Sequence, residues 1–218
     1  MLLRRNDLFV SQVRSSGWSV VGYGVGTVEH SCLRPFWRER SQLQFGLNRF
    51  DHIQQLDRFM SAISTNTIAT IAYAKQILAD IDDSKMCEQP MGLNHPAWLM
   101  LHLATAADYA STLLGGSGVC PAEWNALADT KKPQSQTRSD YPSKSELLST
   151  FEAAFRHASD LYEAKSPEEL NKPQKLGFFE TELPTVGDMA GFLLVAHTNL
   201  HLGQLSAWRR ATGKAPLF

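Results

Sequence analysis

Two histidines, His197 and His201, lie four residues apart in an apolar stretch that runs from Thr185 to Arg210. Residues four apart on a helix lie on the same face, so the two imidazoles would point to one place. Helical histidine pairs with this spacing can bind a single metal ion. The alternative is that each ring has a hydrogen-bond partner, because burying an unpaired imidazole costs on the order of a few kcal/mol.

His102 is the third candidate ligand, because it follows the apolar run Trp98-Leu-Met-Leu in another predicted helix. Taken alone, it is typical of a core histidine that donates to a backbone carbonyl. Taken with the pair, it indicates a three-histidine site. Three neutral imidazoles leave a coordination position open, which is typical of reactive zinc sites, and they suit Zn, Ni, Cu or Fe better than Ca or Mg. His95, at the helix start, ranks behind His102.

The sequence assigns no catalytic residue. It contains no nucleophile triad, no phosphate-binding loop and no carboxylate placed beside the three histidines. Asp108, six residues after His102, should point elsewhere on the helix. Thr105, Tyr109 and Gln204 share faces with the candidate ligands, so they are either hydrogen-bond donors to the site and walls of a pocket, or ordinary packing residues.

Four amphipathic helices are predicted to position these side chains. Apolar residues recur at steps of three and four over 51–82, 95–114, 144–165 and 186–212, and there is little strand signal. The predicted N-caps are Asp51, Asn94, Ser143 and Thr185. The fold class is therefore all-α, an antiparallel-type four-helix bundle. The long linkers after the second and third helices would allow a crossover connection.

Residues 1–46 fit poorly with the rest, so we expect an N-terminal extension (1–46) before one bundle domain (47–218). The extension carries six arginines against three acidic residues, a net charge of +3. It is expected to be disordered or loosely packed, or to be translated from a start codon upstream of the natural one; the alternative is a basic interaction arm.

Composition excludes several classes of protein. The net charge of -1 implies no general nucleic-acid or membrane partner. No apolar run is long enough to cross a bilayer, and the N-terminus lacks the hydrophobic region of a secretory signal. Cys32, Cys87 and Cys120 are far apart and form no CxxC motif, which fits a reducing cytoplasm better than a disulfide framework or zinc ribbon.

Two segments resemble motifs of the DinB-like (DinB/YfiT) metal-binding superfamily. Trp98-Leu-Met-Leu-His102-Leu-Ala-Thr-Ala-Ala-Asp108 resembles its second-helix motif, and the segment from His197 to the closing Gly213-Lys-Ala-Pro-Leu-Phe218 resembles its fourth-helix motif. The resemblance covers residues 50–218. It implies a four-helix bundle, often a homodimer, with zinc or nickel between helices two and four, and it maps the ligands to His102, His197 and His201. In the maleylpyruvate isomerase branch a Glu can occupy the position of His197, so this chain departs from that branch.

By this resemblance we expect a metal-dependent enzyme that acts on a small molecule, either a thiol-dependent S-transferase using a low-molecular-weight thiol or a hydrolase. An alternative is a non-catalytic metal-binding or stress-response module. A third is that the histidines are structural, in a bundle whose role is association; such a protein would hold no metal and its stability would ignore chelators.

Overall fold

The computed structural model describes the backbone of residues 49–217 and the side chains of residues 62–217. The expectations for residues 1–46, as extension or basic arm, lie outside the described residues. The described part is all-α, as predicted, and contains no β-strand, only an isolated bridge between Pro173 and Thr185. None of its helices is long and apolar enough to cross a membrane.

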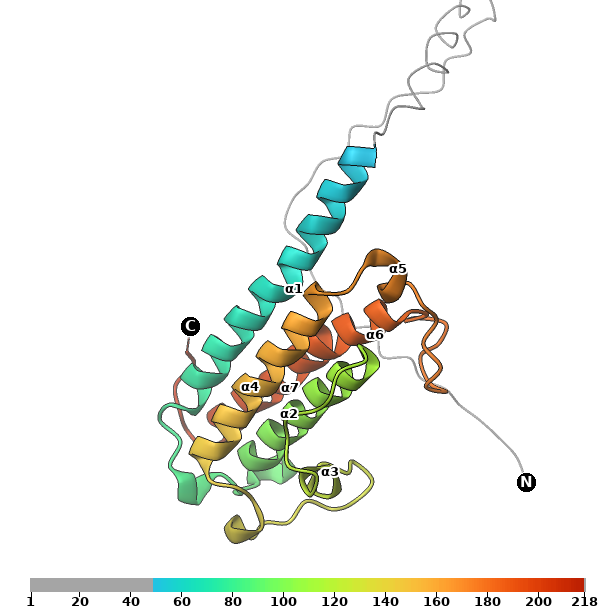
Figure 1. The fold of residues 1–218 in the computed structure, drawn as a ribbon. Helices are drawn as coiled ribbons and strands as arrows, with labels where there is room; N and C mark the ends of the chain where they lie inside the picture. The colour runs from blue at the N-terminus through green and yellow to red at the C-terminus, as the bar shows by residue number, and fades with distance from the viewer. Residues whose placement is uncertain (1–48, 218) are drawn as a thin grey trace, which may run out of the picture. The chain divides into compact units, whose positions relative to one another are not determined.

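Four rods form the bundle (Figure 1). Three are single helices, α1 (Arg49–Leu78), α2 (Pro96–Leu113) and α4 (Lys144–Glu163). The fourth is continuous through three pieces, α6 (Val186–Gly191), the π-helical segment η4 (Phe192–His197) and α7 (Thr198–Ala211). The connections carry the short elements η1 (Asp83–Lys85), η2 (Pro90–Gly92), α3 (Trp124–Leu127), η3 (Arg138–Asp140) and α5 (Pro167–Leu170).

Local capping chemistry explains where the later rods begin. The Ser143 side chain accepts from the Glu146 amide at the start of α4. Thr185 and Asp188 form a complete capping box at the start of α6, as predicted. These side chains satisfy amide groups that the first turn of a helix leaves without partners.

Two predicted caps are wrong. Helix α1 is already formed at Arg49, two residues before Asp51. Helix α2 begins at Pro96, so its cap is His95 rather than Asn94, and His95 Nδ1 accepts from the Trp98 amide at 3.1 Å. Proline suits the first helical position because its missing N–H would lack a partner there, and this fixes the cap one residue later than expected.

The helices do not alternate in direction along the chain. The end of α1 meets the start of α4, where Lys144 Nζ donates to the Ile81 carbonyl at 2.6 Å. The end of α2 lies beside the end of α4, since Gly116 packs against Leu161. Helix α4 is therefore antiparallel to α1 and parallel to α2. The linker between α2 and α4 returns along the bundle, which is the crossover that its length allowed (Figure 1).

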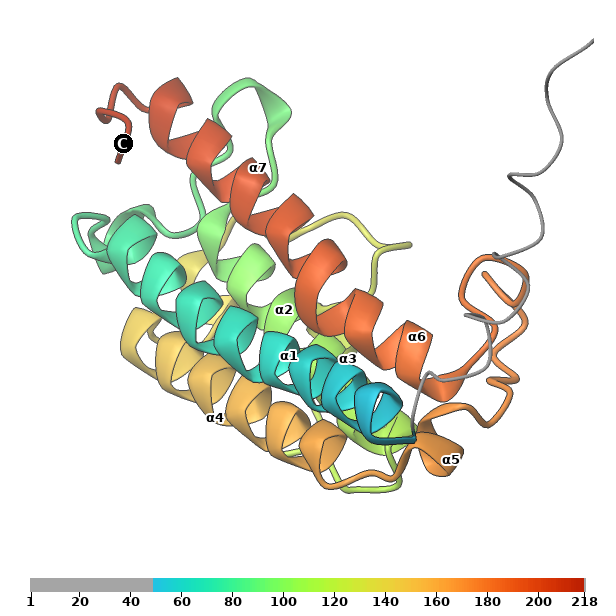
Figure 2. The ribbon, with the colours of Figure 1, turned by 90° about the horizontal axis from the view of Figure 1, so that it is seen from above.

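The C-terminal rod closes the bundle by joining the end of α1 to the loop that precedes α2. The Arg209 side chain is buried and donates to the Ile77 carbonyl at 2.7 Å, and it pairs with the Asp80 carboxylate. The Trp208 indole donates to the Glu88 carbonyl at 2.6 Å. Helix α7 thus runs parallel to α1 and antiparallel to α2, and both neighbours are visible from above (Figure 2).

Candidate metal centre

The three predicted histidines come together between α2 and the C-terminal rod. His102 Nε2 lies 3.3 Å from His197 Nε2, and His201 Nε2 lies 3.1 Å from the same atom. All three ligand atoms lie within 4.8 Å of one another, and each residue is half-buried. Within the described part of the chain, no carboxylate or thiol joins this group.

The two distances from His197 Nε2 to its neighbours, 3.3 and 3.1 Å, fit a single bound cation. Zinc–imidazole bonds of about 2.0–2.1 Å at tetrahedral angles place the nitrogens roughly 3.3 Å apart. His201 Nδ1 lies 3.2 Å from Gln204 Oε1, which can only accept, so Nδ1 carries the proton and Nε2 of the neutral ring presents a lone pair.

Hydrogen bonds alone would satisfy the cluster less well. His197 Nε2 would then have to donate its one proton to two neighbouring nitrogens. His197 Nδ1 is buried and has no hydrogen-bond partner in either arrangement, so it does not decide between them. A cation would instead satisfy all three Nε2 lone pairs at once, so the donor set and its spacing fit a divalent metal.

Aromatic rings fix the imidazole orientations. The Trp98 indole is buried and stacks on His102, with centroids 4.7 Å apart and planes 5° from parallel. The same indole lies edge-on to His201 at 6.5 Å. On the other side, the Phe192 ring lies 6.1 Å from His197. These contacts limit the rotation of the three rings.

The environment keeps the three imidazoles neutral. Burial, aided by the neighbouring His201 and His197 rings, lowers the pKa of His102 to about 4. Burial and the adjacent His201 lower the pKa of His197 to about 4. Burial also lowers the pKa of His201, against the opposing effect of the hydrogen bond that its Nδ1 donates to Gln204. Neutral imidazoles are the form that binds metals.

The remaining histidines and Asp108 have different roles. His95 is fully buried, caps α2 through Nδ1 and bonds the Ser135 carbonyl through Nε2 at 3.0 Å, so neither nitrogen is available. His157 lies on α4, and its Nε2 bonds the carbonyl of Ser117 in the loop after α2. Asp108 points away from the cluster, as predicted, and binds the backbone of residues 119 and 120. The side chains of His30 and His52 lie outside the description.

Thr105, Tyr109 and Gln204 share faces with the ligands, but only the Gln204 side chain contacts a ligand ring, that of His201. The Thr105 hydroxyl donates to the His102 backbone carbonyl at 3.0 Å and not to its ring. The Tyr109 side chain is exposed.

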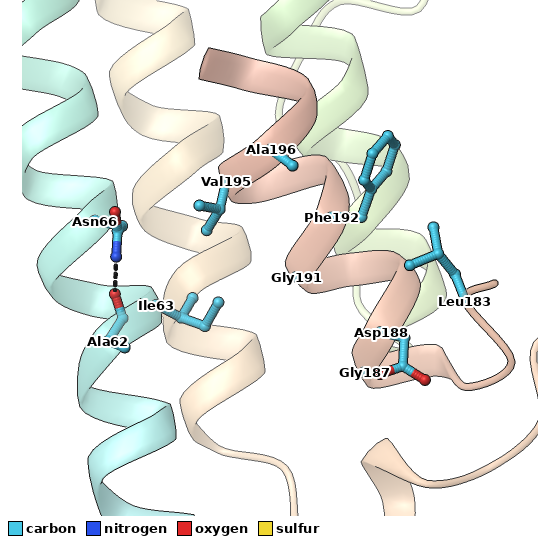
Figure 3. A pocket seen from close by; sticks show the side chains of 10 residues that line it. All are labelled: Ala62, Ile63, Asn66, Leu183, Gly187, Asp188, Gly191, Phe192, Val195 and Ala196. Carbon is cyan, nitrogen blue, oxygen red and sulfur yellow. Dashed lines mark hydrogen bonds between the residues drawn. The ribbon is translucent and has the colours of Figure 1, made fainter. Parts of the chain in front are cut away.

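An apolar pocket lies between α1 and the α6–η4 segment (Figure 3), and one of its lining residues is Phe192, the ring that lies 6.1 Å from His197. Its volume is about 430 Å³, and it is lined by Ala62, Ile63, Asn66, Leu183, Gly187, Asp188, Gly191, Phe192, Val195 and Ala196. The Asn66 amide bonds the Ala62 carbonyl within α1, and Asp188 belongs to the cap of α6. The pocket therefore offers apolar surface next to Phe192 but no free reacting group.

Sequence reasoning missed two features around the cluster. One is the π-helical segment η4, which ends at His197. The other is a set of loop amides, Gln89, Asn94 and Gln134, that reach Gln204 through hydrogen bonds. Nothing in the apolar run Phe192–Ala196 distinguishes a π-helix from an α-helix, and the amides lie in segments far apart in the chain.

Comparison with known families gives one result. The family model described as the DinB superfamily matches residues 67–205, which spans α2, α4 and both histidine-bearing segments. No curated protein and no solved structure matches the chain at a significant level.

Proposed function

The chain belongs to the DinB superfamily, and from this membership and the converging imidazoles we propose that it is a metal-dependent enzyme that acts on a small molecule. The proposed ligands of a divalent zinc or nickel ion are His102, His197 and His201. The observation that carries the proposal is the spacing of the three Nε2 atoms, 3.1 and 3.3 Å from His197 to its two neighbours, with no carboxylate or thiol as a fourth ligand among the described residues.

The incomplete ligand set favours a reactive site. Structural zinc sites have four protein ligands, whereas catalytic sites have three and keep a position for substrate. A divalent ion held here would supply Lewis-acid chemistry for a substrate oxygen or sulfur. The chain's own part is to hold the ion, to fix the rings through Trp98 and Phe192, and to keep the imidazoles neutral. Thiol-dependent S-transfer with a low-molecular-weight thiol, or hydrolysis, suits such a site.

One observation favours the alternative of a non-catalytic metal-binding or stress-response module. Among the described residues, no aspartate or glutamate belongs to the cluster, so a general base of the usual kind is lacking. Both candidate functions therefore require the bound metal, and only the enzyme would show turnover.

Metal content tests the part that both functions share. We expect about one zinc or nickel ion per chain in purified protein, measured by inductively coupled plasma mass spectrometry. His197→Ala should lose most of this metal, and the matched control His157→Ala should keep it. A metal content that is unchanged by His197→Ala would remove both functions.

Turnover separates the enzyme from the binder. The loaded protein would be assayed with glutathione-like thiols and electrophiles, and without thiol on simple esters and amides. Rates that vanish in His197→Ala but persist in His157→Ala support the enzyme. Absence of turnover in every assay favours the binding module.

Two further expectations join the proposal. The homodimer implied by the family resemblance would be seen as twice the chain mass in analytical ultracentrifugation, and a monomer at micromolar concentration would refute it. The cytoplasm is proposed as the location because Cys87 and Cys120 are free thiols in the described fold. A disulfide in protein isolated from its natural source would contradict this location.

A further inference from the structure

A chain of amide side chains leads from the loops to the candidate metal centre. Gln204 Oε1 accepts from Asn94 Nδ2 at 3.0 Å and lies 3.2 Å from His201 Nδ1. Asn94 Oδ1 accepts from Gln134 Nε2 at 2.7 Å. Gln134 Oε1 accepts from Gln89 Nε2 at 3.1 Å, and Gln89 Oε1 accepts from Gln136 Nε2 at 2.8 Å. We call these five residues the amide chain.

All links of the amide chain point the same way. In each of the four links the NH2 group of the outer residue donates to the carbonyl oxygen of the residue nearer to His201. The last oxygen, Gln204 Oε1, therefore faces an imidazole nitrogen that must donate. The direction of the chain thus selects the tautomer of His201 with the proton on Nδ1 and the lone pair on Nε2.

The reverse orientation of Gln204 would have the opposite effect. Its NH2 group would donate to His201 Nδ1, and the neutral ring would then carry its proton on Nε2, the atom that faces His197. That tautomer has no lone pair for a metal ion. An exposed glutamine such as Gln204 does not choose between the two orientations by itself, so a fixed neighbour is needed.

The loop that carries Gln134 is fixed. The fully buried His95 ring bonds the Ser135 carbonyl at 3.0 Å and packs edge-on against Tyr141, with centroids 5.0 Å apart. Arg138 holds the same loop by donating to the Tyr141 and Pro142 carbonyls. The outer part of the amide chain therefore has a rigid support, whereas Gln204 lies on α7.

We propose that Asn94 and Gln134 are positioning residues, which orient the Gln204 amide so that its oxygen fixes the tautomer of His201 for metal binding. This inference rests on the proposed metal centre and adds to it a requirement for amide orientation. Partners of this kind around metal-binding histidines typically change metal affinity by about 10–100-fold.

A double-mutant cycle tests the proposal, with zinc affinity measured by competition against a chromophoric chelator. Asn94→Ala should weaken zinc binding by about 10-fold, and Gln204→Leu by about as much or more. Gln204→Glu should bind zinc at least as tightly as the wild type, because both carboxylate oxygens accept and no orientation is required. Adding Asn94→Ala to Gln204→Glu should then cause little further loss. Gln76→Leu, an exposed glutamine on α1, is the control and should have no effect.

A merely structural role predicts a different outcome. If Asn94 only stabilised the fold, Asn94→Ala would weaken zinc binding by the same factor in the wild type and in Gln204→Glu. Such additive effects of the two substitutions would overturn the proposal. Zinc affinity of Asn94→Ala within 2-fold of wild type would overturn it as well.

The tautomer itself can be read in the metal-free protein, by long-range proton–nitrogen correlation spectra of the His201 ring. The wild type should have the proton on Nδ1, and Asn94→Asp should shift the population toward Nε2, because a carboxylate at position 94 accepts from Gln204 and turns its amide. A wild-type protein with the proton on Nε2 would refute the amide chain's role. If the wild type has the expected tautomer but binds no metal, the proposed function fails while the orientation of Gln204 stands.

Discussion

Asp108 illustrates how a single carboxylate near the candidate centre is used for structure rather than chemistry. Its two oxygens accept from the Val119 amide at 2.9 Å and the Cys120 amide at 2.7 Å. A Cβ atom added at Gly118 would lie 2.5 Å from Asp108 Oδ2, so the loop approaches the carboxylate closely. Burial, aided by the charge of the same carboxylate, raises the pKa of the Cys120 thiol, which keeps it in the unreactive protonated form.

We therefore predict that Asp108→Ala lowers the free energy of unfolding by about 1–3 kcal/mol, because two backbone amides lose a charged acceptor. Metal content should not change, since the carboxylate does not reach the histidines. Urea denaturation and elemental analysis check the two parts. Asp160→Ala, an exposed acid on α4, is the matched control. Loss of metal in Asp108→Ala at unchanged stability would contradict this assignment.

The histidine cluster shows what residue types and spacing can predict. His197 and His201 follow from helical periodicity, because a spacing of four places both rings on one face. His102 required its apolar context and the family resemblance, since no local pattern says which faces of two helices will meet. Gln204 was a candidate from periodicity, but Asn94 was assigned to a helix cap. Its actual partners, Gln204 and Gln134, are 110 and 40 residues away, and such pairing depends on tertiary structure.

Among the elements, the π-helical segment η4 sets the position of the histidine pair. A π-helix widens the turn, and this changes the direction of every side chain that follows. The Thr198 hydroxyl is fully buried and donates to the Leu193 carbonyl at 2.8 Å, across five residues. This bond supports the wide turn directly beside His197.

We predict that Thr198→Val destabilises the fold by about 1 kcal/mol, because the Leu193 carbonyl loses this donor. It should also weaken zinc binding, since the turn that ends at His197 loses support. Zinc competition and thermal unfolding are the measurements. Thr212→Val is the matched control, because its hydroxyl also bonds carbonyls of α7, at the far end from the cluster. Equal zinc affinities in the two variants would argue against a role of η4 in positioning His197.

Element boundaries were predictable where their signal is local. The Thr185–Asp188 capping box starts α6 as the sequence indicated, and Ser166 with Glu169 caps α5. The segment η4 was not predictable, because its residues form an ordinary apolar helical run and the extra residue in the turn is compensated by packing and by Thr198. The start of α2 differed by one residue, since Pro96 and His95 together outweigh the capping preference of Asn94.

For the molecule as a whole, the sequence predicted the fold class but not the directions of the helices. Periodicity gives the number of amphipathic rods, and a long linker permits either direction for the next rod. The parallel pairing of α2 with α4 depends on contacts between segments far apart in the chain. One such contact is the packing of Gly116 against Leu161. The buried Arg209 that joins α7 to the end of α1 is another, and no local pattern in the sequence predicts that this side chain is buried.

The coupled histidines make the stability of the whole metal-free protein depend on pH. In an unfolded chain a histidine has a pKa of about 6.5. In the fold, burial and neighbouring rings lower the pKa of His102 and of His197 to about 4. Between these values the unfolded chain binds more protons, so the free energy of unfolding decreases as the pH falls from about 6.5 toward 4. Above about pH 7 these groups contribute no further pH dependence.

We expect urea midpoints of the metal-free wild type to fall across this window. They should fall less in a variant with His102→Gln and His197→Gln, because its folded and unfolded states no longer differ in protons bound at these sites. The remaining dependence comes from His95 and His201, whose pKa burial also lowers. His157→Gln should keep the wild-type dependence.

Carboxylates whose pKa is lowered by ion pairs, such as Asp80 beside Arg209 and Asp83 beside Arg138, act mainly below pH 4 and cannot produce this difference. Bound zinc should leave in the same window, since protons compete for the same nitrogens. An unchanged pH dependence in the double variant would mean that the cluster is not the group that protonates on unfolding.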